Sequence, residues 1–354
     1  ITQRMVSFSN SLVGHFRGGL AHVNIVSSIL FAGLSGSAVA DTSALGAILI
    51  PAMEKDGYTR RFAAAVTAAS SIIGPIIPPS IMAILYAFVM QVSVASLFLA
   101  GLIPGILMGI GLMAMTKIIA EKKNLPPKRP RESMRQIYVS FRKALLPLLT
   151  PVIILGGIVA GVFTPTEAAA VAVFYALFLA LFILRTLSLR ELPSIFSRAM
   201  ISASSILFIV AAAFLFAWVV TLSGLPRQLA TLAYSLTENK YVLLLLINVL
   251  LLVVGMFLDA GPAVLIVAPI LAPTAVQYGV DPIHFAIVVC VNLSIGLATP
   301  PMGLVLFVTA SVGRVQVTEI FKDMLPYYFM QILVIVLVTY FPSISLTLPR
   351  MFGY

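Results

Sequence analysis

Two short stretches of the chain place an acid beside serine or glycine between long apolar segments. The first runs from Phe31 to Asp41 and contains Ser35 and Ser37, and the second is Asp259-Ala-Gly-Pro262. Carboxylate, hydroxyl and backbone carbonyl oxygens are the ligands that hard cations prefer. An irregular backbone between two helices also leaves carbonyl and N–H groups free for a ligand. These residue types therefore predict two tips that bind an ion together with a small solute.

The composition places these acids in a membrane protein. Of the 354 residues, 60% are hydrophobic and only 10% are charged, and the mean hydropathy is +1.10. Soluble domains carry about 25% charged residues. Apolar segments long enough to span a bilayer recur along the chain, which predicts an all-α polytopic membrane protein. An acid at membrane depth is energetically costly and usually functional.

Each acid-bearing stretch is followed by an apolar segment with a proline pair in its middle. The first break is Gly74-Pro-Ile-Ile-Pro-Pro79, and the second is Gly296-Leu-Ala-Thr-Pro-Pro301. Proline lacks a backbone N–H and clashes with the preceding turn, so both helices should unwind there. We predict two re-entrant hairpins, each paired with a broken transmembrane helix.

The two sets form an internal repeat. Asp41 lies ten residues before Pro51, and Asp259 lies ten before Pro269, an offset of 218 residues; the proline pairs are offset by 222. The second repeat has an odd number of crossings, which predicts inverted repeats, the layout of secondary transporters. It has about 115 residues before its acid and the first only 40, so roughly 75 further residues are expected before Ile1.

The repeat predicts which residues hold which ligand. Unpaired carbonyls suit a hard cation, while helix N-termini suit a carboxylate. The predicted Na⁺ ligands are Ser35, Ser37, Asp41, Gly74, Gly255, Asp259, Gly296 and Thr299. The predicted contacts to a small anion are Ser35, Ser37, Gly261, Asn292 and Thr299. The alternative interpretation is structural, with Asp41 capping a helix and the glycines permitting close packing.

The net charge of +10 is concentrated in one segment. Between Lys117 and Lys143 there are nine Lys or Arg and two Glu, and prolines interrupt the segment. Short basic loops beside transmembrane helices mark the cytoplasmic side, so we assign this loop to the cytoplasm and expect no nucleic acid partner. Elsewhere Thr164-Pro-Thr-Glu167 fits a capped helix start. The single cysteine, Cys290, excludes a disulfide framework.

Four motifs resemble the large membrane subunit, DctM type, of tripartite ATP-independent periplasmic (TRAP) transporters. They are Gly33-Leu-Ser-Gly-Ser-Ala-Val-Ala-Asp41, Ser71-Ile-Ile-Gly-Pro-Ile-Ile-Pro-Pro79, Gly161-Val-Phe-Thr-Pro-Thr-Glu-Ala-Ala-Ala170 and Asn292-Leu-Ser-Ile-Gly-Leu-Ala-Thr-Pro-Pro-Met-Gly303. The resemblance implies sodium-coupled uptake of an organic acid such as a C4-dicarboxylate, sialic acid or another sugar acid. It also implies an elevator mechanism, no cofactor besides the coupling Na⁺, and the same sodium-site residues at the tips and breaks.

The resemblance further implies a small four-helix membrane subunit, a periplasmic binding protein and a bacterial inner-membrane location. In these terms the predicted regions are an interfacial arm helix (1–24), first hairpin and broken helix (25–92), a transmembrane helix (93–120), the basic loop (121–143), scaffold helices (144–224), a connector (225–240), second hairpin and broken helix (241–313) and the last span with the C-terminus (314–354). Relative to that family, we expect an N-terminal portion to precede this sequence.

Two other functions are compatible with two acids at membrane depth. Proton-coupled or exchange transport would use their titration. An intramembrane aspartyl protease would need a motif similar to Gly-x-Gly-Asp, which neither Val39-Ala-Asp41 nor Phe257-Leu-Asp259 supplies. We therefore expect a transporter and not an enzyme.

Overall fold

The computed structural model describes residues 2–123, 125–126 and 130–354, and its regular elements are all helices. Residues 124 and 127–129 of the predicted basic loop lie outside this part of the chain. The helices before that loop are α1 (Thr2–Val13), α2 (Gly19–Ser35), α3 (Ala38–Lys55), α4 (Arg60–Ser71), α5 (Ile81–Met90) and α6 (Val94–Lys122). Those after it are α7 (Met134–Val159), α8 (Pro165–Phe178), α9 (Leu192–Leu222), α10 (Leu225–Leu236), α11 (Lys240–Phe257), α12 (Ala260–Gln277), α13 (Pro282–Gly296), α14 (Leu304–Gly313), α15 (Val317–Tyr340) and α16 (Ser343–Met351).

Seven helices in the described part of the chain are long and apolar enough to cross a bilayer. They confirm the predicted polytopic helical membrane protein. Short π- and 3₁₀-helical segments, Leu179–Ile183 and Leu189–Glu191, connect α8 to α9. Helix α8 starts with the predicted capping box, in which Thr164 and Glu167 satisfy each other's backbone N–H groups.

Helices α2 and α3 form the first predicted hairpin, and its turn requires glycine. Gly36 has φ of 60°, and a Cβ there would clash with the Pro79 carbonyl oxygen. Ser37 then starts α3 as its N-cap, accepting from Ala40 N–H at 3.4 Å. Helices α11 and α12 form the second hairpin, in which Leu258 is extended and Asp259 is the N-cap.

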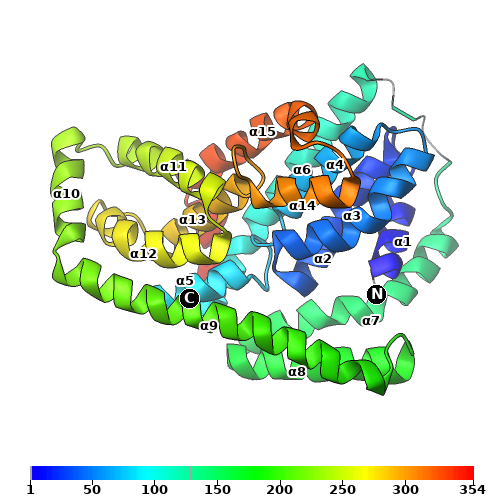
Figure 1. Cartoon of the computed structure of the whole chain (residues 1–354), viewed down its shortest axis with the longest axis horizontal. Coiled ribbons are helices and arrows are strands. Elements are labelled where there is room, and N and C mark those ends of the chain that lie inside the picture. The colour runs from blue at the N-terminus through cyan, green and yellow to red at the C-terminus, as the bar shows by residue number, and fades with distance from the viewer. Residues whose placement is uncertain (1, 124, 127–129) are drawn as a thin grey trace.

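Both broken helices occur where the proline pairs predict them. Residues 72–80 separate α4 from α5, and residues 297–303 separate α13 from α14. The helices that follow the two breaks start differently. Ser80 caps α5 by accepting from Ala83 N–H at 3.1 Å, whereas Gly303 precedes α14 without a side-chain cap. Figure 1 shows both hairpins with their turned ends near the middle of the molecule.

The structure corrects the predicted pairing of the two acids. Helices α3 and α12 are both 18 residues long and start 222 residues apart (260 minus 38), the offset of Gly74 and Gly296. Asp259 therefore corresponds to Ser37, and not to Asp41. The 218-residue offset came from matching Pro51 with Pro269, but α12 contains a second proline, Pro273, that lies 222 residues after Pro51.

Two clusters of buried side chains hold the hairpins and broken helices together. One joins α4, α6, α13 and α15, and the other joins α5, α11, α12 and the start of α6. Helices α7, α8 and α9 lie along one edge (Figure 1) and leave most of their apolar side chains exposed. Because these side chains are apolar along spans of bilayer length, we infer that they face lipid or another membrane protein.

Helices α11 and α13 cross at a glycine pair, which generates a prediction. A Cβ on Gly296 would lie 2.5 Å from Gly255 Cα, so Gly296→Ala should destabilise the fold by about 1–3 kcal/mol through overpacking. The measurement is the melting temperature of the purified protein in detergent. Gly156→Ala on α7 is the matched control, because a Cβ there meets nothing within 4 Å. Equal melting temperatures for both variants would contradict this packing.

Candidate functional site

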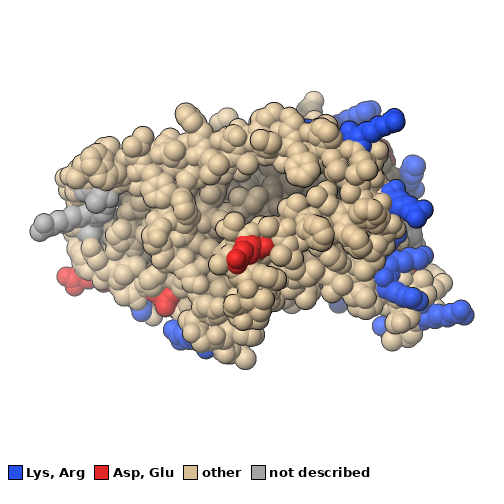
Figure 2. Space-filling model, turned by 90° about the horizontal axis from the view of Figure 1, so that it is seen from below, with Lys and Arg blue, Asp and Glu red and all other residues tan. Residues whose placement is uncertain are grey.

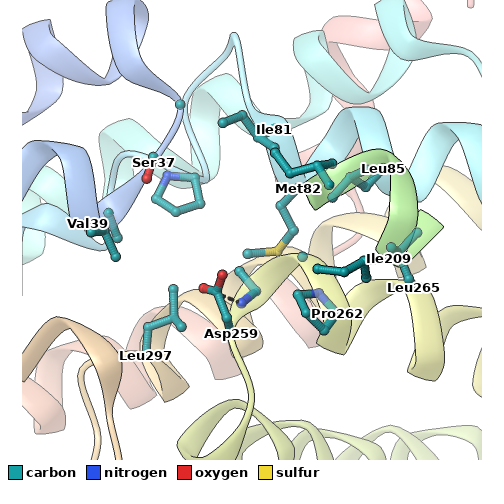
Figure 3. Close-up of a pocket in the computed structure, with 16 residues that line it drawn as sticks. Ser37, Val39, Ile81, Met82, Leu85, Ile209, Asp259, Pro262, Leu265 and Leu297 are labelled. Atoms are coloured by element: carbon teal, nitrogen blue, oxygen red, sulfur yellow. Dashed lines mark hydrogen bonds between the residues drawn. The ribbon is translucent and has the colours of Figure 1, made fainter. Parts of the chain in front are cut away.

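A cavity of about 200 Å³ lies between the tips of the two hairpins. Figure 3 shows Ser37 on one side of this space and Asp259 on the other, with Met82 and Leu85 beside them. The lining comes from both hairpin tips, both breaks, α5 and α9, and comprises Gly36–Val39, Pro75, Ile81, Met82, Leu85, Ile206, Ile209, Asp259–Pro262, Leu265 and Leu297. Segments that are distant in sequence thus share one space.

Two helix N-termini border this cavity from different hairpins. Helix α3 begins after Ser37, and α12 begins after Asp259. Free N–H groups and the positive end of the helix dipole favour a bound anion at each. Ile81, Ile206 and Ile209 add an apolar wall. The space therefore suits a small anion that also has an apolar surface.

The carboxylate of Asp259 works against an anion in this cavity. It caps its own helix, accepting from Ala260 N–H at 2.8 Å, and its side chain is exposed. A fixed negative charge repels a second one at short range, most strongly where water is scarce. A cation beside Asp259 would weaken this repulsion.

Asp41 lies in a different environment from Asp259. It belongs to the first turn of α3 and is 0% exposed. Its Oδ2 accepts from the Ser28 hydroxyl at 2.8 Å, while Oδ1 is buried with no hydrogen bond. The Ser71 hydroxyl lies beside the carboxyl group but donates to the Thr67 carbonyl at 2.8 Å. Among the described residues, no Lys, Arg or His forms an ion pair with Asp41.

Asp41 is part of a buried polar cluster on α2, α3 and α4. Ser28 lies 3.0 Å from the Ser70 hydroxyl, and the Asn24 amide donates to Thr67 at 2.7 Å. Asn24, Ser28 and Ser71 are not among the site residues predicted from the sequence. The sequence feature that could have identified them is the spacing of polar residues four apart, at 24 and 28 on α2 and at 67 and 71 on α4. Residues with this spacing share one face of a helix.

Gly74 brings the first break against the first hairpin tip. A Cβ there would lie 3.1 Å from the Ser37 carbonyl oxygen and 3.2 Å from that of Ser71. The Ser35 hydroxyl accepts from Ser37 N–H at 3.5 Å. The structure therefore brings Ser35, Ser37 and Gly74 together. The Ser37 carbonyl oxygen of the tip and the Ser71 carbonyl oxygen at the start of the break therefore lie close to each other at Gly74.

The residues predicted in the second half lie at three different locations. Asp259 and Gly261 line the cavity. Gly255 and Gly296 instead form the close crossing of α11 and α13. Thr299 lies in the second break, where its hydroxyl donates to the Ile295 carbonyl at 2.8 Å.

Asn292 does not line the cavity in this structure. It is 0% exposed, and its amide donates to Asn248 Oδ1 at 2.9 Å and to the Val288 carbonyl at 2.7 Å. Asn248 in turn donates to the Thr339 hydroxyl at 3.0 Å. The sequence predicts a contact between Asn292 and a small anion, and the alignment of the two broken helices at an offset of 222 places Asn292 opposite Ser70. That alignment leads to a buried network instead.

The donor set also limits the kind of cation. No group of three or more His, Cys, Asp or Glu residues clusters in the part of the chain that the structure describes. The candidate sites offer oxygen atoms from carbonyls, hydroxyls and single carboxylates. Such ligands suit a hard cation, and soft thiolate or imidazole ligands are not among them.

Several apolar spanning helices around a cavity between hairpin tips define a multi-pass membrane transport protein. The chain belongs to the family described as "Tripartite ATP-independent periplasmic transporter, DctM component", which it matches over residues 1–344. This membership makes it a transporter subunit and not an enzyme.

Several proteins of known name are similar to this chain over almost its full length. The C4-dicarboxylate TRAP transporter large permease protein DctM of Pseudomonas aeruginosa is 42% identical over 353 residues, covering 100% of this chain and 82% of that protein. The sialic acid TRAP transporter large permease protein SiaM of Vibrio cholerae is 43% identical over 355 residues, covering 100% and 83%. The 2,3-diketo-L-gulonate TRAP transporter large permease protein YiaN of Escherichia coli is 39% identical over 344 residues, covering 97% and 81%.

The cavity generates a prediction that uses the single native cysteine. Cys290 is buried, so added cysteines report on their own positions. Val39→Cys and Gly261→Cys line the cavity and should react with a small thiol reagent, as measured by mass spectrometry. Ala268→Cys on α12 should be protected, because residue 268 is 0% exposed. Protection of both cavity cysteines, or modification of Ala268→Cys, would contradict the cavity.

Proposed function

We propose that this chain takes up an organic acid, driven by sodium, as the large membrane subunit of a TRAP transporter. The family establishes the subunit and the tripartite system. The relatives named above are permeases for a C4-dicarboxylate, sialic acid and 2,3-diketo-L-gulonate, all of which are carboxylic acids. A carboxylic acid is therefore the proposed substrate class, bound between the N-termini of α3 and α12.

The observation that carries sodium coupling is the buried carboxyl group of Asp41. A buried ionised carboxylate is very costly without a partner charge, so the group must hold a cation or a proton. The neighbouring oxygens of Ser37, Ser71 and the Gly74 segment suit Na⁺, which accepts several oxygen ligands. Asp259, with the second break and Thr299, is the proposed second Na⁺ site. Na⁺ there would also neutralise the charge that opposes the anion.

The equal lengths and common offset of α3 and α12 support an inverted repeat. The two hairpins enter from opposite ends of the molecule, as in alternating-access transporters (Figure 1). We propose an elevator mechanism in which the two hairpins and broken helices move together. Helices α7–α9, which bury little of their surface against the rest, would be the scaffold and would contact the small membrane subunit.

The charge distribution supports a cytoplasmic orientation for one end. Figure 2 shows most Lys and Arg gathered at the end that carries α1, the end of α6 and the start of α7. We assign this end, including loop 117–143, to the cytoplasm of a bacterial inner membrane. A periplasmic binding protein would deliver the substrate to the opposite end.

The second candidate is proton-coupled transport or anion exchange. The buried Asp41 carboxyl group also favours this function, because a protonated carboxyl needs no counter-charge. Replacing the sodium gradient by a pH gradient in the same liposomes separates the two: uptake should follow sodium and not the pH gradient.

Removing the charge of Asp41 tests the proposed function directly. Asp41→Asn should lower sodium-driven uptake into proteoliposomes at least roughly tenfold, because a hydrogen bond or ligand contact to a charged group contributes about 1.5–3 kcal/mol. Asp259→Asn should also lower it. The matched control is Glu54→Gln, which affects only an exposed ion pair with Arg60. Wild-type uptake that persists without a sodium gradient would overturn the proposal.

The orientation makes a separate prediction. Helix α15 ends beside the start of α11, where Tyr340 donates to the Tyr241 carbonyl at 3.1 Å, at the end assigned to the periplasm. Alkaline phosphatase fused after Tyr354 should therefore be active in cells. The same enzyme inserted after Pro130 should be inactive. The reverse pattern would contradict the orientation.

A further inference from the structure

Helix α15 carries a row of polar side chains that contact the first half of the chain. Asp323, Tyr327 and Gln331 are spaced four residues apart, so they share one face of the helix. Asp323 forms ion pairs with Arg61 at 3.2 Å and with Lys123 at 2.5 Å. Tyr327 hydrogen-bonds Thr116 at 3.0 Å. This face therefore fastens α15 to α4 and α6 of the first half.

Gln331 contacts the end of α4, where the first break begins. It is 0% exposed, and its amide nitrogen donates to the Ala69 carbonyl at 3.4 Å. In a continuous helix the Ala69 carbonyl would accept from Ile73, but Ile73 N–H bonds to Ser70 instead. Gln331 thus gives a hydrogen-bond partner to a carbonyl that unwinding has released.

Tyr328 likewise gives a hydrogen-bond partner to a carbonyl group at the second break. Its hydroxyl donates to the Ala298 carbonyl, inside the unwound residues 297–303. Tyr328 and Gln331 are three residues apart, so they lie on the same turn of α15. One turn of α15 therefore binds a carbonyl at the end of α4, next to the first unwound segment, and a carbonyl inside the second.

We propose that Tyr328 and Gln331 are positioning residues that couple the two unwound segments through α15. Neither residue lines the cavity. Each fixes a backbone segment next to a proposed ligand site, so loosening one contact lets α15 shift and loosens the other. Coupling between two sites is reciprocal, so either contact should affect both segments. For sodium binding, this inference rests on the proposed function; for the coupling of the two segments, it does not.

Amide hydrogen exchange of the purified protein, without sodium or substrate, tests the coupling. The variants are Tyr328→Phe, which removes one hydroxyl group, and Gln331→Leu, which replaces the buried amide group by an apolar side chain. We expect each variant to speed exchange in both 72–80 and 297–303, by about two- to tenfold, the range of a lost hydrogen bond. Phe329→Leu is the matched control, because Phe329 is 65% exposed, and it should leave both segments unchanged. If each variant loosens only its own segment, or neither, the coupling is overturned.

The sodium dependence of uptake gives a second, functional readout. In both variants the sodium concentration for half-maximal uptake should rise about two- to tenfold, and the Hill coefficient should fall, while the melting temperature stays near wild type. A lower melting temperature with unchanged sodium dependence would make the residues merely structural. If wild-type uptake needs no sodium, the proposed function fails, and the hydrogen-exchange result still decides the coupling.

Discussion

The structure depends on one constraint, which is that backbone N–H and C=O groups need partners where a bilayer supplies no water. Two helices unwind in the interior of this protein, at residues 72–80 and 297–303, and each releases such groups. The protein supplies partners from elements that are remote in sequence. Tyr328 binds the Ala298 carbonyl, and Gln331 binds the Ala69 carbonyl at the end of α4. Backbone N–H and C=O groups that remain unpaired at the breaks are the groups that can bind a ligand.

The same constraint explains the different positions of the two acids. At a helix N-terminus a carboxylate is stabilised by free N–H groups, so Asp259 can stay charged beside a cavity. One turn inside α3, Asp41 has no such partner and accepts a single hydroxyl. No Lys, Arg or His in the described residues forms an ion pair with it, so the carboxyl group needs either a proton or a cation that the chain does not supply. The environment of Asp259 is therefore set by its own helix N-terminus, and that of Asp41 by its burial.

If the hairpins move as we propose, the packing around the cavity would link this movement to binding. The cavity is lined by both hairpins and also by Ile206 and Ile209 of α9. A solute in it would contact the proposed moving part and the proposed scaffold together. Helix α15 binds a carbonyl at the end of α4 and a carbonyl in the second break, and neither Tyr328 nor Gln331 lines the cavity. The broken helices thus contact both the cavity and α15.

The sequence by itself determined the helical membrane class, the two hairpins, the two breaks and the family. Those features follow from apolar length, proline chemistry and local motifs, which act within a few residues. It did not determine the register of the repeat, because α12 has two prolines and local spacing fitted the wrong one. Nor did it show that Asn292 lies in a buried network with Asn248 and Thr339, or that Ser28 is the partner of Asp41. Only the tertiary structure decided these, because burial and hydrogen-bond partners depend on helices that are distant in sequence.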